Sequence, residues 1–77
     1  GADVPFHADR TFQLLYAPGS SEVVANTRAD SDVTLLAEHG ENEGWFLVKL
    51  SSGITGWVQQ DDLAKASDEY MARWAAG

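Results

Sequence analysis

The stretch from residue 44 to residue 63 constrains the fold more than any other part of the chain. It reads GWFLVKLSSGITGWVQQDDL and carries a Gly-Trp pair on each side of a turn. Apolar residues alternate along both halves, and such alternation is typical of half-buried β-strands. The stretch therefore predicts a β-hairpin with strands over 45–50 and 54–59.

The length of the turn decides which residues face each other across this hairpin. A three-residue loop at 51–53 gives the pairs Leu50 with Ile54, Val48 with Gly56, and Phe46 with Val58. Gly53 then falls where a type I turn followed by a bulge needs a left-handed backbone, which glycine adopts at little cost. A slip by one residue would move the whole apolar set to solvent. We therefore predict the three-residue loop.

The same register places Trp45, Leu47 and Trp57 on the face opposite these aliphatic residues. Leu47 lies across from Trp57, and Trp45 is a diagonal neighbour within reach of a large side chain. Apolar patches on a surface often mark binding sites. The N-terminal segment or a C-terminal helix could instead cover the patch. Both interpretations stay open for Trp57, whereas we expect Trp45 to be partly exposed.

Composition favours one small folded domain. The 77 residues are 44% apolar and include three tryptophans, enough for a modest core.

The formal net charge of -7 makes a phosphate backbone a poor partner, because nucleic-acid binding relies on clusters of Lys and Arg. No apolar run is long enough to span a membrane. Cysteine is absent, which excludes a disulfide framework and a thiol nucleophile. We expect no cofactor and no metal site.

Further short strands are predicted upstream of the hairpin, over 11–16, 22–27 and 33–38, with turns rich in Pro, Gly and Asp between them. This spacing indicates a small all-β barrel or sandwich. Residues 59–63 are expected to form a single helical turn. Ser67 can cap a second helix, in which Tyr70 and Trp74 share a face. We expect that helix to dock on the barrel, the alternative being a neighbouring domain or partner.

Catalytic chemistry is not indicated. Acid–base catalysis needs a positioned titratable group, and nucleophilic catalysis needs a nucleophile beside a base. His7 lies near a chain end, and His39 lies in a turn where a lone histidine is usually solvated. Asp61 and Asp62 are adjacent, so their side chains point apart. We expect that the chain is not an enzyme.

The hairpin resembles the bacterial SH3 domain family (SH3b) of cell-envelope proteins. That family shows a Gly-Trp, a strand with a Val, a Gly-containing turn, a second Gly-Trp or Gly-Tyr, and a closing Leu. The matching positions here are Gly44-Trp45, Val48, Gly53, Gly56-Trp57 and Leu63. The segment 14–24, LLYAPGSSEVV, resembles the family's first strand, Pro-containing loop and second strand. Two places depart from the family: 14–16 replaces a common Asn-Val-Arg, and 30–32 lacks the usual Gly.

The chain is also distantly similar to eukaryotic SH3 domains, which bind proline-rich peptides in an aromatic-lined groove. Trp45 follows the acidic segment 41–43, as the tryptophan of that family does, and Tyr16 lies in the strand that corresponds to the early aromatic motif. The late positions, 59–62, hold neither Pro nor Tyr.

The bacterial resemblance implies an SH3-like barrel of about five short strands over 11–64. An N-terminal extension (1–10) would precede it, and a C-terminal helix or linker (65–77) would follow. The resemblance also implies an exported, non-catalytic module of the bacterial periplasm or cell envelope. Such a module would recognise peptidoglycan or an envelope protein.

The residues expected to bind that ligand are Trp45, Leu47, Trp57, Glu43, Gln59 and Tyr16, with Glu41 and Asp61 completing a polar rim. The alternative is a structural interaction domain that packs against another domain or associates with itself. We expect a monomer or a weak homodimer.

Overall fold

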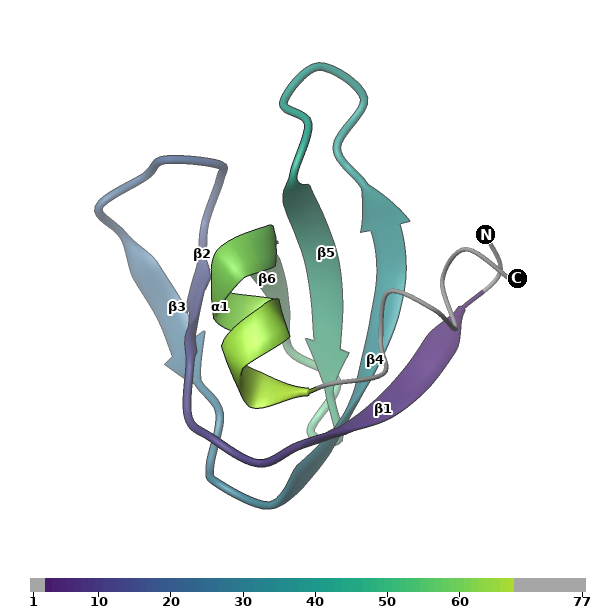
Figure 1. Ribbon diagram of the computed structural model, residues 1–77. Helices are drawn as coiled ribbons and strands as arrows, with labels where there is room; N and C mark the ends of the chain where they lie inside the picture. Colours follow the sequence, from purple (N-terminus) through teal and green to yellow (C-terminus); the bar gives the residue numbers. More distant parts are fainter. Residues whose placement is uncertain (1–2, 68–77) are drawn as a thin grey trace.

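The computed structural model describes residues 3–67, which form six strands and one short helix. In chain order these are β1 (Val4–Ala8), β2 (Gln13–Leu15), β3 (Val23–Asn26), β4 (Ser31–Glu38), β5 (Trp45–Leu50), β6 (Thr55–Gln59) and α1 (Gln60–Ala66). The strands pair antiparallel in one sheet of order β1-β4-β5-β6-β2-β3 (Figure 1). The all-β prediction is confirmed. Among the described residues β1 and β3 form the two edges, and the sheet does not close.

The β5–β6 hairpin has the predicted register. Phe46 faces Val58 and Val48 faces Gly56 across the two strands. The Leu50 N–H donates to the Ile54 carbonyl at 2.9 Å, which closes the loop. Gly53 has a φ of 93°, a left-handed conformation that favours glycine. The three-residue loop is therefore confirmed.

The predicted N-terminal extension contains a strand, β1, that belongs to the sheet. Val4, Phe6 and Ala8 are buried, and the residues between them are exposed, as expected for a strand with one face on the core. Phe6 faces Val33 across the β1–β4 pair. Pro5 is compatible with this strand because β1 lies at an edge of the described sheet. The N-terminal residues thus supply part of the core.

Strand β4 is longer than predicted and carries a bulge. It begins at Ser31, and its pairing with β5 shifts after Leu35, which faces Val48. Ala37 faces Leu47, so Leu36 is the extra residue on the bulged strand. A bulge bends its strand and strengthens the local twist. This irregularity gives β4 its curvature around the core.

Helix α1 packs on one face of the sheet (Figure 1). Leu63 and Ala66 are buried there, three residues apart and on the same side of the helix. They join a core made by Val4, Phe6, Ala8, Phe12, Leu14, Val33, Leu35, Phe46, Val48 and Val58.

The helical turn predicted over 59–63 is a longer helix in the structure, where α1 runs from Gln60 to Ala66. The boundary expected between the barrel and the C-terminal segment, after residue 64, falls inside this helix. The second helix predicted after Ser67, with Tyr70 and Trp74, lies outside the described residues.

Candidate functional site: an apolar row across five strands

The face opposite the core carries a row of apolar side chains that crosses five adjacent strands. Directly opposite residues on antiparallel strands place their side chains on the same face, so successive register partners define a row. The partners in order are Val23 of β3, Leu15 of β2, Trp57 of β6, Leu47 of β5 and Ala37 of β4. We call these residues the apolar row. The row follows from strand order, which brings β2 beside β6.

The three predicted apolar binding residues lie together on this face. Leu47 faces Trp57 directly, and Trp45 faces Gln59 two positions further along the same pair of strands. All three apolar side chains are partly exposed. Helix α1 packs on the core side, through Leu63 and Ala66, so it does not cover Trp57. Trp57 is therefore neither fully exposed nor fully covered, because neighbours on its own face shield part of its side chain.

One of those neighbours is His39, in the loop between β4 and β5. The imidazole of His39 meets the indole of Trp57 edge to face, with ring centroids 4.8 Å apart. Its Nδ1 accepts the backbone N–H groups of Glu41 and Asn42 at 3.1 and 3.2 Å. The expectation of a solvated turn histidine is wrong, because His39 is half-buried and holds the loop. No short-range sequence signal reveals this contact, since it depends on β4 and β6 being on either side of β5.

The β4–β5 loop is further held by Glu38 and Gly44. A Glu38 carboxylate oxygen accepts the Gly44 N–H at 3.0 Å, and Gly44 has a φ of 80°. The Gly44 carbonyl in turn accepts the Gln60 N–H at 2.7 Å. The loop that carries the acidic residues of the rim is therefore tied to both its own strand and the start of α1.

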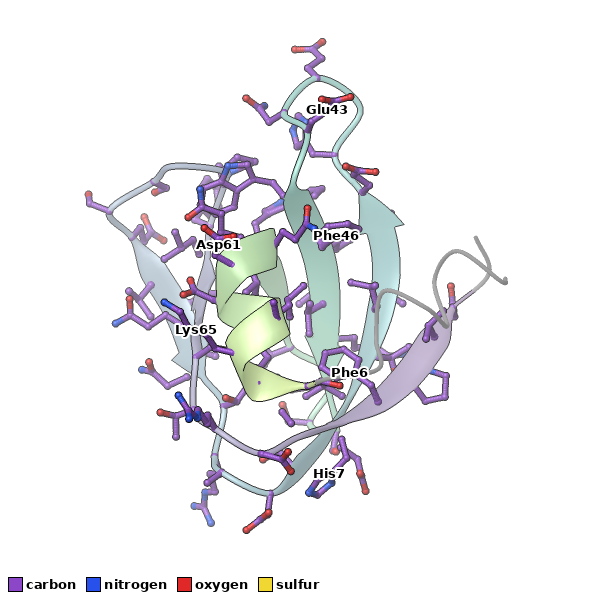
Figure 2. The ribbon with its side chains drawn as sticks, in the orientation of Figure 1. Phe6, His7, Glu43, Phe46, Asp61 and Lys65 are labelled. Atoms are coloured by element: carbon purple, nitrogen blue, oxygen red, sulfur yellow. The ribbon has the colours of Figure 1, made fainter. Side chains whose placement is uncertain are left out.

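The predicted polar residues lie around this face in different ways. Gln59 is exposed and faces Trp45 across the hairpin. Glu43 is exposed near the tip of the β4–β5 loop, and Asp61 lies in the first turn of α1 (Figure 2). Tyr16 follows Leu15 of β2 directly and is 68% exposed, so it adjoins the β2 member of the apolar row. The structure thus brings Gln59 next to the tryptophans and leaves Glu43 and Tyr16 at the margins.

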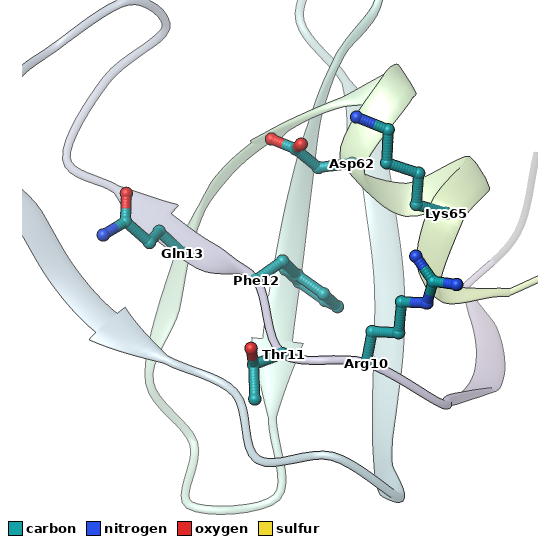
Figure 3. A pocket seen from close by; sticks show the side chains of 6 residues that line it. All are labelled: Arg10, Thr11, Phe12, Gln13, Asp62 and Lys65. Carbon is teal, nitrogen blue, oxygen red and sulfur yellow. The ribbon is translucent and has the colours of Figure 1, made fainter.

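A concave feature lies elsewhere, on the helix side of the sheet. It is a shallow cavity of about 330 Å³, lined by Arg10, Thr11, Phe12, Gln13, Asp62 and Lys65 (Figure 3). The start of β2 and the preceding loop form one wall, and two α1 side chains form the other. None of the residues predicted to bind ligand lines this cavity, so it is separate from the apolar row.

His7 forms a polar cluster with three aspartates at the far end of the β1–β4 pair. Its Nδ1 lies 3.0 Å from Asp32 Oδ1, and its Nε2 lies 3.3 Å from Asp30 Oδ1 and 3.8 Å from Asp9 Oδ1. Hydrogen bonds to Asp32 and then Asp30 raise the pKa of His7 above its usual 6.5. In the sequence His7 is only a residue near a chain end, whereas in the structure it lies in strand β1 and is paired with Asp32 of β4.

No helix within residues 3–67 is long and apolar enough to cross a membrane. The chain matches none of the protein-family models, curated proteins or solved structures with which it was compared.

Proposed function

We propose that this chain is a non-catalytic binding module of a bacterial cell-envelope protein that recognises peptidoglycan or an envelope protein. The apolar row and Trp45 are its contact surface, and Gln59, Glu43 and Tyr16 contribute at the margins. The module acts in the periplasm or cell envelope, as implied by the resemblance of 11–64 to bacterial SH3 domains. On this proposal the six-stranded sheet is a variant of the SH3-like barrel.

One observation carries the proposal: the unbroken apolar row from Val23 to Ala37, which lies on the sheet face that α1 does not cover. Apolar side chains that continue across several strands on a non-core face are typical of interaction surfaces. Tryptophan at the centre of such a surface is enriched among residues that dominate binding energy. The row contains Trp57 at its centre, with Trp45 beside it.

The chemistry of this surface suits a ligand with flat or apolar groups and hydrogen-bonding edges. Indole rings bury a large area at low conformational cost, and they also donate through the ring N–H. Gln59 supplies an amide donor and acceptor next to Trp45. Sugar rings and peptide side chains of peptidoglycan offer both kinds of group. The formal charge of -7 disfavours strongly anionic ligands.

The proposal is tested by an amide NMR titration of the chain with soluble peptidoglycan fragments, following the indole N–H signals of Trp45 and Trp57. We expect shifts confined to these indoles and to their neighbours on the apolar face. Trp45→Ala should weaken binding by about tenfold or more, as for a tryptophan that dominates the energy of an interface. Ile54→Ala is the matched control, because Ile54 is 45% exposed and lies outside the row.

Unchanged binding by Trp45→Ala, with a native amide spectrum, would contradict the site. An absence of any shift at millimolar fragment would contradict peptidoglycan as the ligand. The same spectra recorded with candidate envelope proteins would then test the protein-partner branch.

A second function, a structural interaction domain, is favoured by the edge position of β3. The apolar row ends there at Val23, which is 38% exposed. A row that runs to an open sheet edge can continue onto a strand of another domain or of a second copy. Sedimentation velocity over a wide concentration range distinguishes the two functions. A mass that rises with concentration, and falls back in Val23→Asp, would support self-association, whereas a constant monomer mass would oppose it.

A further inference from the structure

The register of β1 and β4 gathers four chemically active side chains on one surface. His7 faces Asp32, and the next pair along is Ala8 with Ser31. Asp9 and Asp30 come one position further, immediately beyond the paired strands: Asp9 lies in a bend, and Asp30 lies in a turn with a left-handed φ of 59°. We call these four residues the His7 cluster. The β1–β4 pairing sets His7 beside Asp32, and the bend and turn at the end of the pair bring Asp9 and Asp30 to the same imidazole.

The separations between the ligand atoms are close to those of a small metal site. His7 Nε2 lies 3.3 Å from Asp30 Oδ1 and 3.8 Å from Asp9 Oδ1, and all three ligand atoms lie within 4.8 Å of one another. Metal–ligand bonds of about 2.0–2.2 Å in a tetrahedron place neighbouring ligand atoms about 3.3–3.6 Å apart. Both carboxylates are exposed, so their side chains have room to rotate towards this geometry.

The position of Asp32 separates this cluster from an ordinary acidic patch. Its Oδ1 lies 3.0 Å from His7 Nδ1. When Nδ1–H donates to Asp32 and Nε2 gives up the proton it shares with Asp30, the Nε2 lone pair points to the side of Asp9 and Asp30. A carboxylate on the other nitrogen of the ring is the usual support for a metal-binding histidine, because it fixes both tautomer and orientation. The imidazole nitrogen also favours zinc over magnesium or calcium as the bound ion, since imidazole is a better ligand for zinc.

The charges of the cluster are unbalanced without a cation. Three carboxylates surround one imidazole, and the carboxylate oxygens of Asp9 and Asp30 nearest to it lie within 4.8 Å of each other. Like charges at that separation repel each other. A divalent ion between the two carboxylates would offset their repulsion, and it would join residues on both sides of the β1–β4 pair.

We propose that His7 Nε2, Asp9 and Asp30 bind Zn²⁺, with Asp32 as the residue that positions the imidazole and water as a further ligand. The ion links β1 to the turn before β4, so it stabilises the docking of the first strand. The site is distinct from the proposed binding surface. Figure 2 shows His7 and Glu43 at opposite ends of the molecule.

The test is calorimetric and NMR titration of the metal-free chain with ZnCl₂ in a buffer that does not bind metals. We expect one ion per chain, shifts of the His7 ring signals, and a higher thermal midpoint, because an ion that binds only the folded state stabilises it. His7→Gln, Asp9→Asn and Asp30→Asn should each weaken binding at least tenfold. Asp32→Ala should weaken it by about tenfold, as expected for a supporting carboxylate.

Asp62→Asn is the matched control, since it removes the same charge from the exposed side of α1. The proposal is overturned if Zn²⁺ binds His7→Gln as tightly as the unaltered chain, if His39 signals respond in place of His7, or if Mg²⁺ binds equally well. Asp9→Asn keeps the test decisive if His7→Gln does not fold, because Asp9 lies outside the strand and its carboxylate is exposed. Binding by Asp9→Asn at full strength would then refute the site.

Discussion

The imidazole of His39 meets the indole of Trp57 at an interplanar angle of 61°, while its Nδ1 accepts two backbone N–H groups of the β4–β5 loop. An acceptor nitrogen carries no proton, so the neutral ring has its proton on Nε2. We predict that ¹⁵N NMR of His39 shows the Nε2–H tautomer of the neutral ring.

The same contact predicts how the loop responds to substitution. His39→Phe keeps an aromatic ring beside Trp57 but removes the acceptor for the Glu41 and Asn42 N–H groups. We expect faster hydrogen exchange at those two amides, with little change at Trp57. Equal exchange rates in the two proteins would show that Nδ1 does not hold the loop.

Gly56 lies where β6 passes closely over β2. A Cβ at this position would approach Leu14 Cβ to 2.6 Å and Val24 Cγ2 to 2.9 Å. Overpacking of this kind costs about 1–3 kcal/mol, so Gly56→Ala should lower the free energy of unfolding by that amount in urea denaturation. Gly40→Ala is the control, because a Cβ added there would meet no neighbouring atom within 4 Å. A change within about 0.5 kcal/mol is expected there.

Thr27 bridges the start of β2 to the end of β3 from a buried position. Its Oγ1 accepts the Phe12 N–H at 2.8 Å, and its own N–H donates to the Phe12 carbonyl at 2.9 Å. Thr27→Val keeps the shape but leaves the Phe12 N–H without its acceptor, which costs about 1–3 kcal/mol. Thr27→Ser retains the hydroxyl and should lose less. Equal destabilisation by both variants, measured by chemical denaturation, would contradict this role for the hydroxyl.

His7 makes stability depend on pH in the metal-free chain. Because Asp32 and Asp30 raise its folded-state pKa above 6.5, the stabilisation is fully present below pH 6.5. This stabilisation is lost as the pH rises through the raised pKa of His7. The difference in thermal midpoint between the unaltered chain and His7→Gln should therefore be largest near pH 6 and vanish towards pH 9, with a chelator present. A constant difference across this range would contradict the charge interaction.

The NMR titration of His7 checks the same shift directly. Its ring signals should titrate with a midpoint above 6.5, and Asp32→Asn should lower that midpoint, since it removes the carboxylate with the largest effect. A midpoint unchanged by Asp32→Asn would show that Asp32 is not the main cause of the raised pKa of His7.

The hairpin could be predicted from the sequence because the alternation of side chains along a strand and the length of the turn are local properties. Gly53 and the alternation of Phe46, Val48 and Val58 allow only one register that keeps the apolar set on one face. The same local information places Trp45 and Trp57 on the other face.

Features that depend on pairing between distant segments were not predictable in this way. Val4, Phe6 and Ala8 do alternate, but Pro5 and the polar neighbours obscured the strand until β4 provided its partner. The extra Leu36 of the bulge has no local signature. The row from Val23 to Ala37 also required the pairing of β2 with β6, which no spacing in the chain reveals.

The hydrogen bond from the Asp9 N–H to the Ala66 carbonyl, at 2.8 Å, joins the residue after β1 to the last turn of α1. As the chain leaves the ribosome, β1 emerges first, yet its partner β4 comes only after β2 and β3. Its contact with α1 must wait until residue 66 has been made. The described strands can therefore complete their packing only after the segment up to α1 is synthesised, and the folding rate should be governed by these long-range closures more than by the fast local hairpin.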